Sequence, residues 1–180
     1  MKKILLIAAA SLFVSTTVFA DTPTNKAIGY DAVLNGLSAR VITSSGIGVQ
    51  GIIGLNVVSP KASGTSTGMD LNLGLNVFKS CWKADKVNLN GFAGVQMMMS
   101  KPTIKDADSQ TNFAIMAGAE PEIFLLSNLS VSTKFGLQIQ LNGDTLNAAG
   151  KTVKDTGGTS FGTFGQRISI VDGFSFNWYF

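Results

Sequence analysis

Two carboxylates that could share acid–base work are Glu120 and Glu122, which lie two positions apart across Pro121. Held in different environments, such a pair can supply a general acid and a general base. The chain contains no histidine, which excludes His-based triads and metal sites built on histidine. We therefore expect a structural role for the pair, and predict no catalytic residue, no cofactor and no metal site.

The sulfur-containing residues also indicate no catalytic or metal site. Cys81 is the only cysteine, so no intrachain disulfide can form. It lies in the short polar stretch 79–83, and without histidine a Cys/His catalytic pair is excluded. The run Met97-Met-Met99 is more typical of packing than of a soft-metal site, which needs converging ligands. The chain is predicted not to be an enzyme.

Beyond residue 25 the dominant pattern is alternation with period two, which is typical of β-strands with two different faces. It is clearest in 69–77, where every odd position is apolar and every even one is polar or glycine. Weaker alternation over 26–34 and 37–41 flanks Asn35-Gly36, a strong hairpin signal. The other predicted strands cover 46–58, 87–97, 112–120, 129–141 and a C-terminal strand ending at Phe180. The total is eight strands.

The last strand leaves one alternative open. Asp172-Gly173 is a turn signal and could form a hairpin between two separate strands. We favour one long strand bulged near Gly173, because the parity of Ile168 and Ile170 continues into Phe174 and keeps the strand number even. Asp172 then falls on the apolar face.

Connection lengths predict how the strands are oriented. Short connections are expected at 43–45, 79–85 and 126–128, and long polar ones at 59–67, 100–109 and 142–157. Short and long connections alternate, so all the long ones fall at one end. This asymmetry is typical of outer-membrane barrels, with short periplasmic turns and long external loops.

The contents of the two faces distinguish a membrane barrel from a soluble one. A soluble lipocalin-like barrel would have to bury the Leu, Ile and Phe side chains of seven strands in a lumen too narrow for them. Turned inside out, polar side chains fill the lumen and apolar ones meet lipid. The predicted fold is an all-β, eight-stranded antiparallel up-and-down transmembrane β-barrel. Lumen charges are expected at Arg40, Asp70, Glu120, Glu122, Lys134 and Arg167.

The lumen charges are balanced, three of each sign. A three-residue turn at 126–128 would place Glu120 opposite Lys134, and we predict an ion pair between them. Charges in a low-dielectric interior must be paired, so a balanced set fits a filled, closed lumen. An ion pathway is the alternative.

Residues 1–20 have the features of a cleaved signal peptide: Lys2 and Lys3, an apolar run, and Val18-Phe19-Ala20 as a cleavage site. This leaves residues 21–180 as the barrel domain. Without Lys2 and Lys3 the chain has 12 basic and 11 acidic residues and no basic run. Nucleic acid is therefore not an expected partner.

The chain resembles small bacterial outer-membrane β-barrel proteins, including uncharacterised porin-like ones, and is similar in plan to the OmpA/OmpX-type eight-stranded membrane domains. The matching features are the signal, the alternation, and the ending Phe174-x-Phe176-x-Trp178-x-Phe180. A second match is the strand–turn–strand built from Gly118-Ala-Glu120, Phe124, Asn128-Leu-Ser-Val131 and Phe135-Gly136.

The resemblance implies an outer-membrane location, lipid as a partner and a monomeric state. It implies that the outer-membrane assembly machinery recognises the C-terminal strand. Five residues are assigned to this signal and to an aromatic girdle that also includes Trp82: Phe174, Phe176, Trp178, Tyr179 and Phe180.

The function expected from these patterns is a non-enzymatic outer-membrane barrel with surface-exposed loops that serve envelope structure, adhesion or surface binding. One alternative is a narrow porin-like channel for small solutes. A weaker alternative is a soluble periplasmic or secreted ligand-binding barrel. The sequence identifies no ligand or solute.

Overall fold

The computed structural model describes residues 25–164 and 174–180, which form ten β-segments. The predicted signal peptide lies outside this range. No helix in the described part is long and apolar enough to cross a membrane. The segments are β1 (Asn25–Asp31), β2 (Gly36–Ile42), β3 (Ile47–Val58), β4 (Gly68–Ala84), β5 (Val87–Lys101), β6 (Gln110–Leu126), β7 (Leu129–Ser132), β8 (Phe135–Asn142), β9 (Gly158–Phe164) and β10 (Ser175–Tyr179).

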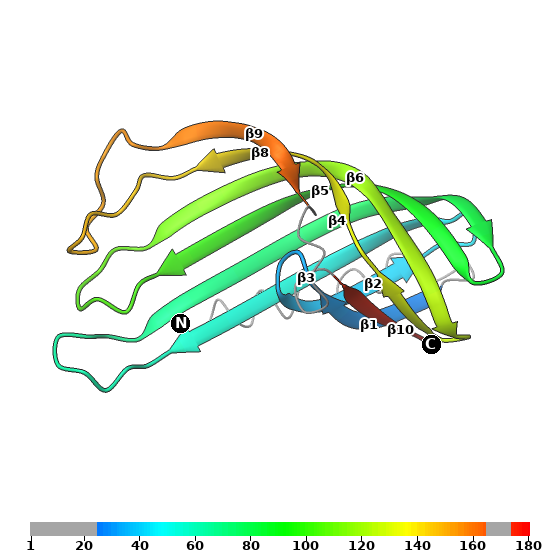
Figure 1. Cartoon of the computed structure of the whole chain (residues 1–180), viewed down its shortest axis with the longest axis horizontal. Coiled ribbons are helices and arrows are strands. Elements are labelled where there is room, and N and C mark those ends of the chain that lie inside the picture. The colour runs from blue at the N-terminus through cyan, green and yellow to red at the C-terminus, as the bar shows by residue number, and fades with distance from the viewer. Residues whose placement is uncertain (1–24, 165–173) are drawn as a thin grey trace.

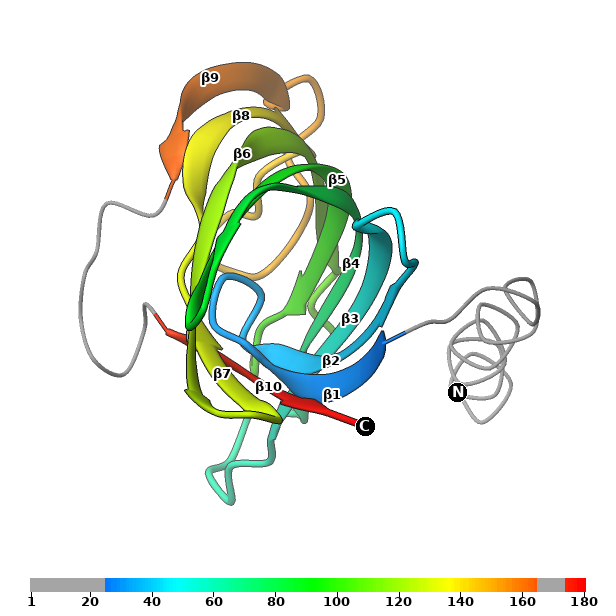
Figure 2. The same ribbon diagram turned by 90° about the vertical axis from the view of Figure 1, so that its right-hand side faces the viewer.

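These segments form one antiparallel sheet that closes on itself, and Figure 2 shows the ring end-on. Residues 122–126 of β6 pair with β7, and residues 113–119 of β6 pair with β8. β7 and β8 therefore occupy one strand position of the barrel, which we call a strand line. β10 pairs with β7 and β9 pairs with β8, so β9 and β10 follow the next line. With each line counted once, the predicted eight-stranded antiparallel barrel is confirmed.

The β9–β10 line departs from the predicted continuous strand. On the β7–β8 line, Ser132 and Gly136 are four residues apart, whereas their partners Ser175 and Phe164 on the β9–β10 line are eleven residues apart. The β9–β10 line therefore has a surplus of seven residues over this distance. A β-bulge adds one residue, so the surplus exceeds the bulge we expected. A hairpin joining β9 to β10 is excluded, because both run antiparallel to the same neighbouring line and therefore in one direction. Asp172 and Gly173 themselves lie outside the described residues.

The two ends of the barrel differ as the connection lengths predicted. Figure 1 shows the connections 59–67, 102–109 and 143–157 gathered at one end, which we call the loop end. The connections 43–46, 85–86 and 127–128 lie at the opposite turn end with the C-terminus. One prediction was too long: 79–85 is not a connection, because β4 and β5 stay paired out to Ala84 and Val87.

The burial pattern is the inverse of that of a soluble domain. On β4, Leu75 and Val77 are 52% and 51% exposed, whereas Asn76 between them is 1% exposed. Among the described residues, 26 large hydrophobic side chains are exposed, and fourteen polar or charged residues are buried against eight hydrophobic ones. The predicted face assignment is thus confirmed. Ile52, an apolar residue with the same parity as the buried Gln50, also lies inside the barrel.

The number of paired residues between neighbouring strands varies around the ring. β4–β5 and β5–β6 are joined by fifteen and fourteen residue pairs, whereas β1–β10 and β10–β7 have four each. The short strands close the ring only toward the turn end. Toward the loop end, residues 54–58 of β3 pair with β4 alone and β9 pairs with β8 alone within the described part.

Candidate functional site: the barrel lumen

The loop between β1 and β2, residues 32–35, folds into the barrel, and we call it the plug loop (Figure 2). Asp31 Oδ1 accepts hydrogen bonds from the backbone N–H groups of Val33 and Leu34, both at 3.1 Å. This Asx-type arrangement turns the chain inward. Asn35 then takes a φ of 49° and β2 begins at Gly36. The loop therefore has four residues, where a two-residue turn at Asn35-Gly36 was predicted.

The lumen wall has space for the plug loop because two positions facing it carry no side chain. A Cβ added to Gly54 would lie 2.8 Å from the Leu34 carbonyl oxygen and 2.7 Å from that of Asn35. Gly74 lies against the Leu34 side chain, which is 2% exposed. Asn72 Nδ2 donates to the Leu34 carbonyl oxygen at 2.9 Å. The loop is thus fixed by packing and by a hydrogen bond.

A buried ion pair joins the end of β1, directly before the plug loop, to the far wall. Lys134, at the break between β7 and β8, contacts Asp31 Oδ2, and both side chains are at most 1% exposed. Lys134 Nζ also donates to Gln50 Oε1 at 2.7 Å and lies 5.7 Å from the centroid of the Phe92 ring. Desolvated charges need such partners, so this lysine is held by a carboxylate, an amide and an aromatic face together.

A second buried cluster lies around Arg40. Its Nη2 is 2.6 Å from Glu120 Oε1 and its Nη1 is 3.5 Å from Glu122 Oε1, with all three side chains at most 1% exposed. The guanidinium carbon of Arg40 also lies 4.7 Å from the centroid of the Phe78 ring. Ser132 Oγ donates to Glu120 Oε1 at 2.7 Å. The charges of this cluster are therefore paired, although Arg40 Nε and Glu120 Oε2 are buried without a hydrogen-bond partner among the described residues.

Among the described carboxylates of the lumen, Glu122 accepts the most hydrogen bonds. Its Oε1 accepts hydrogen bonds from Tyr179 Oη at 2.6 Å and Asn177 Nδ2 at 3.3 Å, and also from Ser130 Oγ. Its Oε2 accepts from Asn90 Nδ2 at 3.3 Å. The donors come from β5, β7 and β10. Glu122, which lies on β6, thus ties both neighbouring strands to the closing segment β10.

The structure brings together four of the predicted lumen charges, Arg40, Glu120, Glu122 and Lys134. Asp70 also faces inward but lies apart, near the loop end, where Asn56 Nδ2 and Ser100 Oγ donate to it. Arg167 lies outside the described residues. Asp31 was missed, because the first strand carries little pattern. Its only signal was the shared parity with Ala27 and Gly29, small residues on an inward face.

The predicted ion pair between Glu120 and Lys134 is wrong. The flanking pairs Ala119↔Phe135 and Glu122↔Ser132 do place the two residues at facing positions. Within the described residues, however, Glu120 pairs with Arg40 and Lys134 pairs with Asp31. Strand register fixes which side chains are neighbours along the wall, but in a narrow lumen partners reach across it.

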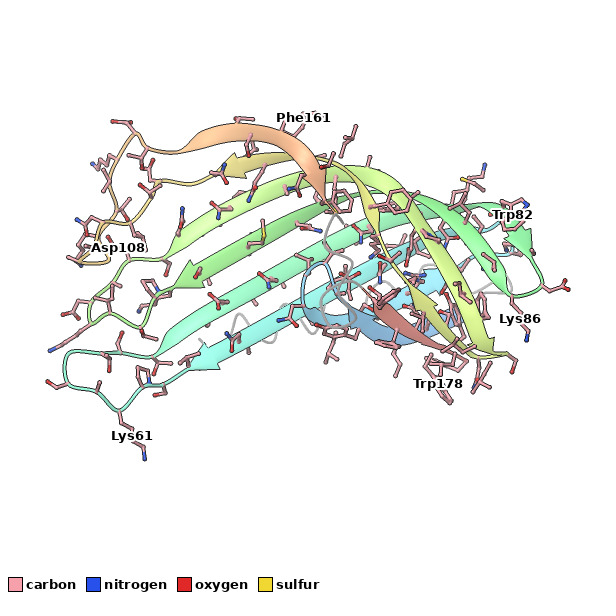
Figure 3. All side chains as sticks on the ribbon, viewed as in Figure 1. Lys61, Trp82, Lys86, Asp108, Phe161 and Trp178 are labelled. Carbon is pink, nitrogen blue, oxygen red and sulfur yellow. The ribbon has the colours of Figure 1, made fainter. Side chains whose placement is uncertain are left out.

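The C-terminal aromatics divide between the two faces. Phe176, Trp178 and Phe180 are 48%, 48% and 70% exposed on the outer face, whereas Phe174 is half-buried. Figure 3 shows Trp178 and Trp82 at the turn end. Tyr179 differs from its assignment to the girdle: strand alternation points it inward, and its hydroxyl joins the lumen network.

Cavities occupy both ends of the lumen. The cavity at the loop end has a volume of about 230 Å³ and is floored by Asn35. The cavity at the turn end has a volume of about 280 Å³ and includes Lys83 and Tyr179. The two share no lining residue. The plug loop and the buried charges separate them.

The site can do little chemistry of its own, since Glu120 and Glu122 are 0% exposed and engaged by Arg40. In residues 25–164 and 174–180, no group of three or more His, Cys, Asp or Glu side chains could hold a metal ion. The arrangement is suited to sealing and bracing a barrel. No protein-family model matches the chain, and no curated protein or solved structure is significantly similar to it.

Proposed function

We propose that the protein is a non-enzymatic integral outer-membrane β-barrel whose lumen is plugged and whose loop-end surface serves envelope structure, adhesion or surface binding. The observation that carries this proposal is the apolar outer face, which no second layer of structure covers in the described residues. Monomeric soluble proteins rarely expose contiguous apolar patches of more than a few hundred square ångströms. A lipid bilayer would cover such a face without further protein.

Strand lengths and aromatic positions support the same proposal. A transmembrane β-strand needs about 9–11 residues, and β3, β4, β5 and β6 have 12, 17, 15 and 17. Trp82 and Trp178 lie at one end of the apolar face, where an interfacial girdle would lie (Figure 3). The turn end would then face the periplasm and the loop end the exterior.

The long connections support a role at the exterior because they form one linked surface. A β-bridge joins Thr65 to Ile104, connecting the first and second long connections. Asp108 Oδ2 accepts hydrogen bonds from the backbone N–H and hydroxyl of Thr152, connecting the second and third. Lys151 adds a hydrogen bond to the Asp106 carbonyl oxygen at 2.6 Å. Such a preorganised surface loses less conformational entropy on binding than separate flexible loops would.

The test is membrane fractionation combined with a heat-shift gel and a matched pair of arginine substitutions. Leu75→Arg places a charge on the apolar face and should destabilise the refolded barrel by about 2–4 kcal/mol in lipid. Val153→Arg, at an exposed position of the third long connection, should change the stability by less than about 0.5 kcal/mol. A chain that fractionates as soluble and tolerates Leu75→Arg would instead support a soluble periplasmic or secreted barrel.

A narrow channel is the second candidate, favoured by the cavities at both ends of the lumen. Planar-bilayer recording separates it from a plugged barrel. We expect no conductance above leak, because the plug loop and the Arg40 cluster both lie between the cavities. Reproducible small openings of the unmodified chain would favour the channel.

A further inference from the structure

We propose that the loop-end cavity, which we call the cup, is a binding site for a neutral polyhydroxylated group about the size of one sugar ring. The inference names a ligand class for the proposed surface binding. It rests on that proposed function only for the side of the membrane from which the ligand arrives.

The size and composition of the cup favour a small polar ligand. Its volume of about 230 Å³ is below the roughly 300–1,000 Å³ typical of sites for drug-sized molecules. The hairpin of β1 and β2 contributes the floor, and β3 to β6 contribute the walls. The lumen-facing residues of the walls are Asn56, Asp70, Asn72, Met98, Ser100 and Asn112.

Three of these amides are oriented by the protein and keep one polar atom free. Asn72 Nδ2 donates to the Leu34 carbonyl oxygen, which leaves its Oδ1 free. Asn56 Nδ2 donates to Asp70, which also leaves an Oδ1. Asn112 Oδ1 accepts from the Gly143 N–H, which leaves its Nδ2. None of these three atoms hydrogen-bonds to a described residue. The cup thus offers two oriented acceptors and one oriented donor.

Asp70 determines which charge the cup accepts. Ser100 Oγ donates to its Oδ1 at 2.6 Å and Asn56 Nδ2 to its Oδ2 at 3.2 Å, so two neutral donors hold the carboxylate in place. Among the residues that the structure describes, no basic side chain lines the cup. An anionic ligand would meet an unfavourable field, whereas a hydroxyl can donate to the remaining lone pairs of the carboxylate.

Hydroxyl groups fit this set better than an amine does. Each hydroxyl both donates and accepts, so a ring of hydroxyls can use the free oxygens of Asn56 and Asn72 together with the free Nδ2 of Asn112. An ammonium group donates only and would leave that Nδ2 without an acceptor. The Met98 side chain supplies an adaptable apolar contact for the carbon face of a ring.

The experiment uses the full mature chain refolded in a polyoxyethylene detergent, which carries no sugar headgroup. Methionine methyl groups are labelled with carbon-13, and the Met98 signal is assigned from the Met98→Leu variant. Methyl glucoside and methyl galactoside are titrated, with propylammonium as the cationic comparison. We expect a saturable shift of the Met98 signal in the millimolar range with at least one sugar, and none with propylammonium.

Two variants and one control test where the sugar binds. Asp70→Asn and Asn112→Leu should each weaken the affinity about tenfold, the factor that follows from losing one good hydrogen bond. The control is Asn142→Leu, which removes a lumen-side amide of β8 that does not line the cup and should change affinity less than about twofold. A heat-shift gel checks that each variant is folded.

The remaining outcomes are decisive. No saturable shift with either sugar overturns the proposal, as does binding of propylammonium in place of sugar, or sugar binding that both cup variants leave unchanged. A titration with octyl glucoside distinguishes a lipid-linked sugar from a free one as the ligand. Tighter binding of octyl glucoside than of methyl glucoside indicates a lipid-linked sugar, and equal affinities indicate a free sugar. Because these titrations are made in detergent, failure of the cup leaves the fractionation result unaffected.

Discussion

Asp31 and Lys134 lie 103 residues apart in the chain and form an ion pair inside the barrel, fully shielded from solvent. The pair joins the last residue of β1, directly before the plug loop, to the break between β7 and β8. It therefore connects the first hairpin to the penultimate strand line across the lumen. A contact of such sequence separation forms only once the ring is nearly complete.

Lys134→Met should destabilise the barrel by about 3–5 kcal/mol, because it leaves the Asp31 carboxylate buried and unpaired. Urea unfolding in lipid or detergent, followed by the heat-shift gel, measures the change. The double variant Asp31→Asn with Lys134→Met removes both charges and keeps an oxygen to cap Val33 and Leu34. It should recover a large part of the loss. If the Lys134→Met variant is as stable as the original chain, the ion pair does not contribute to the stability of the barrel.

Gly54→Ala should displace the plug loop, because the new methyl group would meet two backbone carbonyl oxygens that cannot rotate away. We expect a cost of about 1–3 kcal/mol, as for other overpacked sites. Gly162→Ala is the matched control, because a Cβ there has no atom within 4 Å. It should be neutral or slightly stabilising. Equal effects of the two substitutions would show that the loop does not pack on Gly54.

Tyr179→Phe should cost about 1–3 kcal/mol, because it removes a hydroxyl that donates to the buried Glu122 carboxylate. Tyr30→Phe removes a hydroxyl that contacts the exposed side of Asn35 and should change stability by less than about 0.5 kcal/mol. Tryptophan fluorescence during urea unfolding reports both. If the two losses are alike, Tyr179 acts only through its ring, which packs against the Phe124 ring at a tilt of 38°.

The link between the long connections should depend on pH. Hydrogen bonds from the backbone and the hydroxyl of Thr152, with Lys151 nearby, hold the pKa of the exposed Asp108 carboxyl below its ordinary value of 3.8. Because the folded-state pKa is lowered, the contribution to stability is present above pH 3.8 and is lost as the pH falls through the folded-state pKa. The amide NMR signal of Thr152 should titrate with a midpoint below 3.8. A midpoint above this value would contradict the link.

Alternation predicted the barrel well, because one face of every strand must differ from the other wherever the two faces meet different surroundings. Positions such as Leu75 and Asn76 are assigned correctly from parity alone. Connection length likewise placed the long connections at one end. These features depend on local sequence.

The lumen partners could not be predicted in the same way, since they depend on distances across the ring. Parity placed Arg40, Glu120 and Lys134 inside, but whether Lys134 meets Glu120 or Asp31 depends on barrel diameter and on the plug loop. The inward fold of residues 32–35 depends on Gly54 and Gly74, which lie in other strands. No local pattern in the first hairpin contains that information.

The four-pair joints on either side of β10 have a kinetic consequence. Closing the ring brings the last residues of the chain to the first strand, the contact with the largest loop-closure cost, and that contact has few backbone hydrogen bonds to offset the cost. The fourteen- and fifteen-pair joints of β4, β5 and β6 can form earlier from neighbouring hairpins. We therefore expect folding to end, and unfolding to begin, at β10.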